Sequence, residues 1–153
     1  MMTYRHALRT TLGATLAVVL FAACGLMPAH AQSNMVAFTT QLGGANEVPP
    51  AASAATGQVD ATLNKDTNEL RWQLSYDGLS GPATAAHFHG PAKEGSNTGV
   101  VVPFPGAISS PMSGQATLTA AQAADLTAGM WYANVHTAKF PGGEIRGQMK
   151  VRP

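Results

Sequence analysis

Three histidines, all after the first thirty residues, are the side chains whose type and spacing could support chemistry. His87 and His89 flank Phe88 in a segment that alternates like a β-strand. Both imidazoles should therefore point to one face of the strand and Phe88 to the other. Such a pair offers a metal ion two adjacent nitrogen ligands. His-x-His also occurs where the histidines are only exposed or hydrogen-bonded side chains, and that alternative stays open.

The third histidine, His136, ends a second strand-like segment, residues 131–136, in which Asn134 and His136 share a face. If this strand pairs with the His87 strand, or faces it across a sandwich, three neutral imidazoles converge on one point. Imidazole suits copper and zinc better than magnesium or calcium, and an oxidising compartment favours Cu(II). We therefore predict a metal site at His87, His89 and His136, with copper favoured over zinc and one coordination position open.

Other residue types give weaker signals. Met112, Met130 and Met149 are candidate soft axial ligands for copper, but methionine in a strand is more often core filler. Trp72 and Trp131 are expected in the core. The sequence has no glycine-rich phosphate loop, no serine, histidine and aspartate in catalytic spacing and no carboxylate pair, so it gives hydrolase chemistry no support.

The elements that must position these residues are short strands. Apolar and polar residues alternate with the period of half-buried strands, and glycine and proline mark the gaps between them. The turn-forming sequence NKDTN predicts a hairpin between two of these strands. The expected strands comprise residues 36–42, 59–63, 70–76, 85–89, 99–103, 112–118, 130–136 and 144–151. We predict an all-β fold, either an antiparallel Ig-like or SOD-like β-sandwich or a Greek-key barrel.

One short helix interrupts the strand pattern. The sequence TAAQ from Thr119 to Gln122 fits a capping box, in which the Thr119 hydroxyl accepts from the first turn and Gln122 reaches back. The helix should cover residues 120–126 and end near Gly129. Its place in the sequence suggests that it crosses between two sheets.

The first thirty-one residues have the three-part layout of a secretory signal peptide. A polar stretch with two arginines precedes an apolar run over residues 12–23, and small residues end at Ala31. We expect cleavage between Ala31 and Gln32, which leaves residues 32–153 as a single periplasmic or secreted domain. The apolar run is shorter than the roughly 20 residues of a membrane-spanning helix, so we expect no membrane span.

A second processing route is also open. The sequence FAACG, residues 21–25, resembles the lipobox of bacterial lipoproteins, in which Cys24 would be acylated and become the N-terminus. Phe21 stands where a leucine is usual. Only acylation would anchor the protein to a membrane through lipid.

Removal of the signal peptide changes the composition. Without Arg5 and Arg9, seven basic residues remain against eight acidic ones, a formal charge of −1. A nearly neutral chain without a basic cluster argues against nucleic acid or anionic lipid as a partner. Cys24 is the single cysteine, so a chain cleaved after Ala31 has neither disulfides nor thiolate ligands.

The sequence resembles the CHRD, or chordin-domain, family over residues 38–149. The resemblance rests on four separated motifs in the family's order: LGGANEVPP at 42–50, AHFHGPA at 86–92, WYANVHT at 131–137 and PGGEIRGQ at 141–148. It implies an all-β sandwich of the kind found in extracellular chordin proteins and in bacterial exported proteins. It implies no defined biochemical activity.

A more distant likeness links the order of the histidines and Arg146 to copper-zinc superoxide dismutase, in which paired and late histidines bind copper and an arginine guides the anion. The bridging histidine, the zinc ligands and the disulfide cysteines have no counterparts here. By this likeness Arg146 and Glu144 are candidates for groups that face an anion or support the metal ligands. The alternative for both is a salt-bridged pair on an edge strand.

Three functions remain after this reasoning. The first is a copper-binding module that works outside the cytoplasm through His87, His89 and His136. The second is a domain that binds another extracytoplasmic protein or matrix, with structural histidines. The third is an oxidoreductase that uses the same ligands, so whether the protein is an enzyme stays open.

Overall fold

The computed structural model describes residues 34–153, so the predicted signal peptide and Cys24 lie outside the described residues. In the described part the chain forms nine strands, one α-helix and one 3-10 turn. In order, they are β1 Met35–Gly43, η1 Gly44–Asn46, β2 Thr56–Asn64, β3 Glu69–Asp77, β4 Ala83–His89, β5 Val100–Pro103, β6 Met112–Thr117, α1 Ala120–Thr127, β7 Tyr132–Thr137, β8 Ile145–Gln148 and β9 Lys150–Val151. The predicted all-β fold with one short helix is confirmed.

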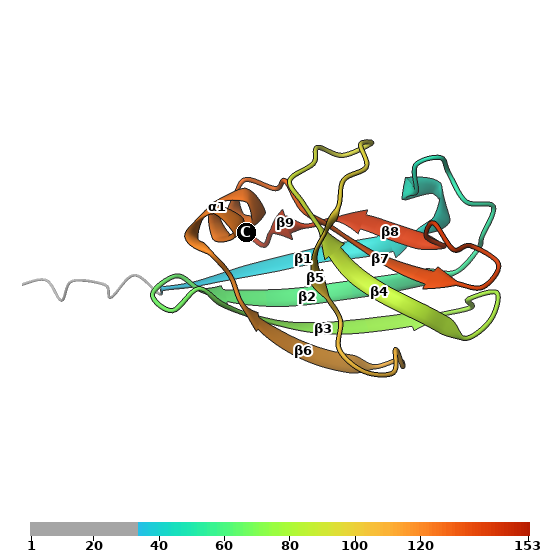
Figure 1. Cartoon of the computed structure of the whole chain (residues 1–153), viewed down its shortest axis with the longest axis horizontal. Coiled ribbons are helices and arrows are strands. Elements are labelled where there is room, and N and C mark those ends of the chain that lie inside the picture. The colour runs from blue at the N-terminus through green and yellow to red at the C-terminus, as the bar shows by residue number, and fades with distance from the viewer. Residues whose placement is uncertain (1–33) are drawn as a thin grey trace, which may run out of the picture. The chain divides into compact units, whose positions relative to one another are not determined.

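All the described strands belong to one antiparallel sheet. Its order is β5-β4-β7-β8-β1-β2-β3-β6, and β9 pairs with β1. The sheet curls so that its two halves face each other, as Figure 1 shows, and the two edge strands β5 and β6 do not pair with one another. Trp72 of β3 meets Phe88 of β4 across the interior, with ring centroids 5.4 Å apart. The molecule is therefore a nearly closed sandwich or barrel.

The alternating residues of the strands fill the interior, because successive side chains of a strand point to opposite faces. In β2 and β3 the buried positions follow one another at every second residue. The predicted hairpin is confirmed, with Val59 opposite Leu74 and Leu63 opposite Leu70. Trp72 and Trp131 are both buried in the core, as expected.

The capping box of α1 is confirmed. The Thr119 hydroxyl accepts a hydrogen bond from the Gln122 backbone N–H at 3.2 Å, and the Gln122 side chain accepts from the Thr119 backbone N–H at 2.9 Å. The helix packs against the core through Ala123 and the fully buried Leu126. The helix carries the chain from the edge strand β6 to β7 in the other half of the sheet.

One predicted strand differs from the structure. Residues 144–151 form two strands, because Met149 leaves the ladder and donates its backbone N–H to the Trp131 carbonyl at 2.9 Å. Its side chain enters the core. The first of the two strands, β8, lies between β7 and β1, so the interpretation of this segment as an edge strand is wrong.

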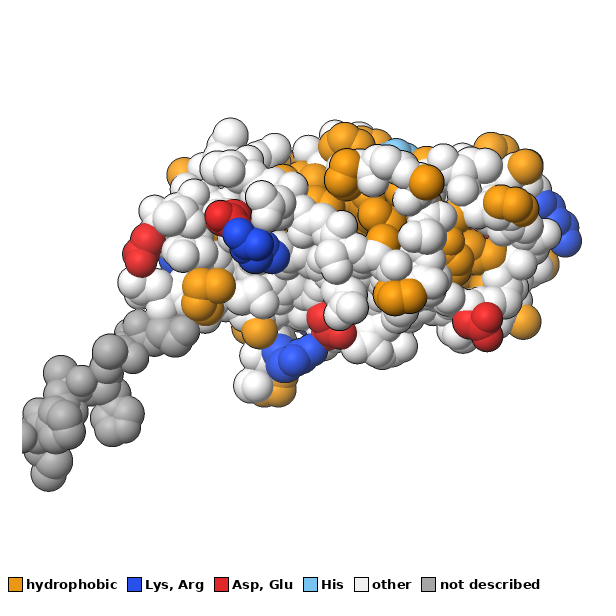
Figure 2. Space-filling model, turned by 90° about the horizontal axis from the view of Figure 1, so that it is seen from below, with side chains coloured by type: hydrophobic (Ala, Val, Ile, Leu, Met, Phe, Trp, Pro, Cys, Tyr) orange, Lys and Arg blue, Asp and Glu red, His pale blue; other side chains and the backbone are white. Residues whose placement is uncertain are grey.

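Apolar side chains reach the surface where the sheet does not close. Figure 2 shows hydrophobic side chains gathered on the face that is seen from below in Figure 1. The half-buried apolar residues of β5, β6 and the connection between them are Val101, Ile108, Met112 and Ala116. Among residues 34–153, no helix has the length and apolar character that a membrane span requires.

Candidate metal centre

The pairing of β4 with β7 brings the three predicted histidines together. The two strands are antiparallel, with Ala85 opposite His136 and His87 opposite Asn134. Since side chains alternate along each strand, the three histidines and Asn134 lie on the outer face of the sheet, while Phe88 enters the core. The first of the two alternatives, paired strands rather than strands that face each other, is therefore the observed one.

The three imidazoles converge. One ring nitrogen from each of His87, His89 and His136 lies within 4.8 Å of the other two. The closest contact joins His87 Nδ1 to His136 Nε2 at 3.1 Å. His89 and His136 are buried, whereas His87 is half-buried and forms the accessible rim of the cluster. These positions could hold a metal ion.

Backbone carbonyls fix the orientation of two of the rings. His89 Nδ1 lies 2.9 Å from the Thr98 carbonyl oxygen, and His136 Nδ1 lies 3.0 Å from that of Pro141. A carbonyl oxygen can only accept, so each Nδ1 carries the proton and each Nε2 keeps its lone pair. Metal-binding histidines commonly donate their second N–H in this way, which sets the ring orientation.

The surroundings of His87 and His136 disfavour the protonated form of both side chains. Burial, together with the neighbouring His136 and His89, lowers the pKa of His87 to about 4. Burial also lowers the pKa of His136, against an opposing effect of the Pro141 carbonyl. A neutral imidazole is the form that coordinates a metal.

His89, Tyr132 and Arg146 form a stack beside the cluster. The His89 and Tyr132 rings are parallel with centroids 4.6 Å apart, and the Arg146 guanidinium carbon lies 3.4 Å from the Tyr132 centroid. Arg146 is only 2% exposed, and it donates to Asn97 Oδ1 and to the Ser96 carbonyl, at 2.7 Å each. It therefore positions the loop between β4 and β5 and does not face solvent or an incoming anion.

Glu144 has a structural environment rather than a catalytic one. Its carboxylate is fully buried and accepts hydrogen bonds from the hydroxyls of Ser53, Ser80 and Thr137 and from the Ser80 backbone N–H, at 2.6–2.8 Å. Burial alone would raise the pKa of Glu144, but these hydrogen bonds outweigh burial and lower it. Within residues 34–153 neither Glu144 nor Arg146 forms an ion pair, so the predicted salt-bridged pair is wrong.

Two further residues at this face carried no predicted role. Asn134 is 3% exposed, and its Oδ1 lies between the Nε2 atoms of His89 and His136. Glu47 is 6% exposed, with Oε1 unpartnered, and its carboxyl occupies the space that a Cβ would take at Gly143. Both belong to motifs of the sequence, but the motifs do not indicate that Asn134 contacts two histidines or that Glu47 lies near Arg146.

Two of the three methionines considered as axial copper ligands, Met112 and Met149, belong to the core side of the sheet rather than to the histidine face. Met149 belongs to the buried core, and Met112 packs against that core. Met130, which is half-buried, donates its backbone N–H to the carbonyl of Asp125 in α1. Core packing accounts for Met112 and Met149.

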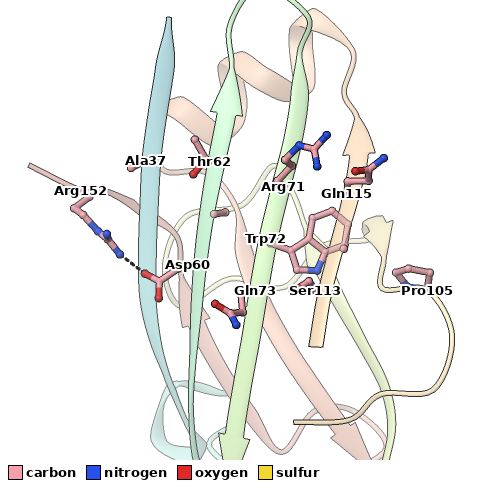
Figure 3. A pocket seen from close by; sticks show the side chains of 12 residues that line it. Ala37, Asp60, Thr62, Arg71, Trp72, Gln73, Pro105, Ser113, Gln115 and Arg152 are labelled. Carbon is pink, nitrogen blue, oxygen red and sulfur yellow. Dashed lines mark hydrogen bonds and ion pairs between the residues drawn. The ribbon is translucent and has the colours of Figure 1, made fainter. Parts of the chain in front are cut away.

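A separate hollow of about 680 Å³ lies on β1, β2, β3 and β6. Figure 3 shows Asp60, Arg71 and Gln73 projecting from β2 and β3 there, with Trp72 beside β6. Its charges are already paired: Asp60 with Arg152, and Arg71 with Glu69. The hollow therefore lacks the converging titratable groups that distinguish the histidine cluster.

Comparisons with known proteins bear on the whole domain. No curated protein and no solved structure matches the chain. The family model described as CHRD domain matches residues 38–149, which is well over half of the sequence and includes all three clustered histidines. The chain therefore belongs to the CHRD domain family.

Proposed function

We propose that this CHRD domain protein binds a copper ion through His87, His89 and His136 outside the cytoplasm. One observation carries the proposal. The two buried histidines direct unprotonated Nε2 atoms into one small volume that the third histidine borders. Packing alone does not require three imidazole rings from two strands to converge on one point.

The donor set supports copper as the metal. Three imidazoles without a thiolate suit Cu(II) or Zn(II), and a compartment outside the cytoplasm favours oxidised copper. The absence of a carboxylate from the cluster argues against calcium or magnesium, which prefer oxygen ligands. Zinc is the second choice on the same donors.

The compartment is part of the proposal. The signal-like segment over residues 1–31 supports export, with residues 32–153 as the mature domain. Acylation at Cys24 would instead hold the same domain at a membrane surface.

A Cu(II) titration of the metal-free mature protein tests the proposal. We expect a more than about hundredfold loss of Cu(II) affinity in each of the single variants His87→Ala, His89→Ala and His136→Ala. Removing a residue that only supports a ligand typically costs up to about a hundredfold, and removing a ligand itself should cost more. Double variants should lose little more, because the ligands act as a unit. Gln58→Ala, a polar change on β2 away from the cluster, is the control and should bind like the wild type.

Two outcomes of this titration would contradict the proposal. If the wild type does not bind Cu(II) or Zn(II), or if His136→Ala binds as tightly as the wild type, the three-histidine site is wrong. The histidines would then be structural, and the domain would be a module that binds another extracytoplasmic protein.

A further inference from the structure

The side chain of Asn134 lies at the centre of the histidine cluster. Asn134 is opposite His87 on β4 and opposite Arg146 on β8, so its side chain shares the outer face of the sheet with theirs. Its Oδ1 is 3.1 Å from His89 Nε2 and 3.0 Å from His136 Nε2. With 3% of its surface exposed, the amide has no access to bulk water.

These two contacts lack a proton to share. The Thr98 and Pro141 carbonyls require N–H at the Nδ1 atoms of His89 and His136, so both Nε2 atoms are acceptors. Asn134 Oδ1 is an acceptor as well. With Oδ1 in this position three lone pairs face one another inside the fold, and their repulsion is relieved either by a cation between them or by a turn of the amide that presents its Nδ2 donor instead.

Three of the separations fit a shared cation. Ligands at 2.0–2.1 Å from a metal ion lie roughly 3.3 Å apart in a tetrahedron and, when adjacent, roughly 2.9 Å apart in the square plane typical of Cu(II). The contacts from Asn134 Oδ1 to the two imidazoles, and from His136 Nε2 to His87 Nδ1, are 3.0–3.1 Å. His87 is the least buried of the three histidines, so its ring has the most freedom to complete the geometry.

We infer that Asn134 supplies the fourth ligand, an amide oxygen, to the ion bound by the three histidines. This inference rests on the proposed function and changes one of its features. The sequence predicts three histidines with an open coordination position, whereas Asn134 would fill that position from within the protein. In zinc proteins, a site with four protein ligands is structural, and a site with three leaves a position for water or substrate. Asn134 therefore favours a copper-holding module over an oxidoreductase.

Azide is the probe that tests the inference, because it binds Cu(II) at a free position and produces a charge-transfer absorption band. Wild-type protein loaded with Cu(II) should bind azide weakly. Asn134→Ala should bind Cu(II) about 10 to 100 times more weakly than the wild type, and, once loaded, should bind azide at least about tenfold more tightly. A residue that only positioned the histidines would not open a place for azide.

Two variants complete the experiment. Asn134→Asp keeps an oxygen at the same place and adds a negative charge, so it should bind Cu(II) more tightly than the wild type while azide stays excluded. Gln148→Ala removes a second buried amide, which lies on the neighbouring strand β8 and on the same face of the sheet as Asn134. The Gln148 amide donates to the Ala92 and Gly129 carbonyls. Gln148→Ala should lower stability and leave both affinities unchanged.

The outcomes separate the inference from the proposed function. If the wild type does not bind Cu(II), the proposed function fails. If the wild type binds Cu(II) and has the same azide affinity as Asn134→Ala, the fourth ligand is not Asn134 and the three-histidine site stands. Should Asn134→Ala not fold, Asn134→Asp with unchanged affinity for both Cu(II) and azide would overturn the inference.

Discussion

Glu47 is a buried acid without the partners that usually accompany one. Burial raises its pKa to about 7, although the nearby positive charge of Arg146 and a hydrogen bond from the Val48 backbone oppose this effect. A carboxyl group with this pKa is protonated in part at neutral pH, and its Oε1 has no hydrogen-bond partner. Glu144, in contrast, accepts four hydrogen bonds and stays ionised, so two buried carboxyl groups of one domain differ because their neighbours differ.

The raised pKa of Glu47 predicts a pH-dependent contribution to stability. An acid whose pKa is higher in the folded than in the unfolded state favours folding below its unfolded pKa, here 4.5, and loses this effect as the pH rises through about 7. Glu47→Gln should therefore gain stability relative to the wild type between pH 5 and pH 8, by at most about 3 kcal/mol.

Urea unfolding of metal-free protein at several pH values measures this difference. Glu94→Gln, at an exposed position, is the matched control and should keep a constant difference from the wild type. A difference between Glu47→Gln and the wild type that does not change with pH would show that Glu47 ionises normally.

The sequence was sufficient to predict the histidines but not their neighbours. Spacing of two residues on a strand places His87 and His89 on one face whatever the rest of the fold does. Asn134 also shares a predicted face with His136, yet only the register of β7 against β4 puts its amide between two imidazoles. Glu47 lies near Arg146 and directly follows η1, and no periodicity predicts such a position.

At the scale of elements, Glu144 joins segments that are distant in sequence. It follows the loop after β7, and its carboxylate binds Ser53 ahead of β2, Ser80 between β3 and β4, and Thr137 at the end of β7. The same loop supplies the Pro141 carbonyl that orients His136. One carboxylate thus fixes three connections at the end of the sheet where this loop lies.

Loss of that carboxylate should destabilise the whole domain. Glu144→Ala leaves the hydroxyls of Ser53, Ser80 and Thr137 without their acceptor and should cost about 3 kcal/mol or more, because several buried donors lose their partner at once. The free energy of unfolding in urea is the measurement. Glu69→Ala, which removes an exposed ion pair with Arg71, should cost less than about 1 kcal/mol. Similar losses for the two variants would contradict the structural role of Glu144.

The elements differ in how far local sequence determines them. The capping residues of α1 and the turn between β2 and β3 act over a few residues, and both were predicted. The break between β8 and β9 depends on a long-range hydrogen bond from Met149 to the Trp131 carbonyl, which no local pattern indicates. The position of β8 inside the sheet likewise depends on its pairing with β7 and β1.

For the whole molecule, the curled sheet separates two environments. Apolar residues of both halves fill the interior, and the histidine cluster lies outside it, covered by the loop between β4 and β5. This arrangement lets His89, His136, Arg146 and Asn134 be buried without entering the apolar core. The alternation of the strands predicts the interior, but the covering loop has no periodicity and could be located only in the structure.

The proposed export predicts a defined N-terminus for the mature protein. Two arginines, an apolar run and small residues ending at Ala31 support cleavage before Gln32, so mass spectrometry of the exported form should give the mass of residues 32–153. Cys24→Ser should leave this product unchanged, because a signal peptidase of this kind does not require the cysteine. Ala31→Phe should block cleavage, since a bulky side chain replaces the small residue at the cleavage site. If the natural product instead begins at a lipid-modified Cys24, and Cys24→Ser abolishes processing, the domain is a lipoprotein and acts at a membrane surface.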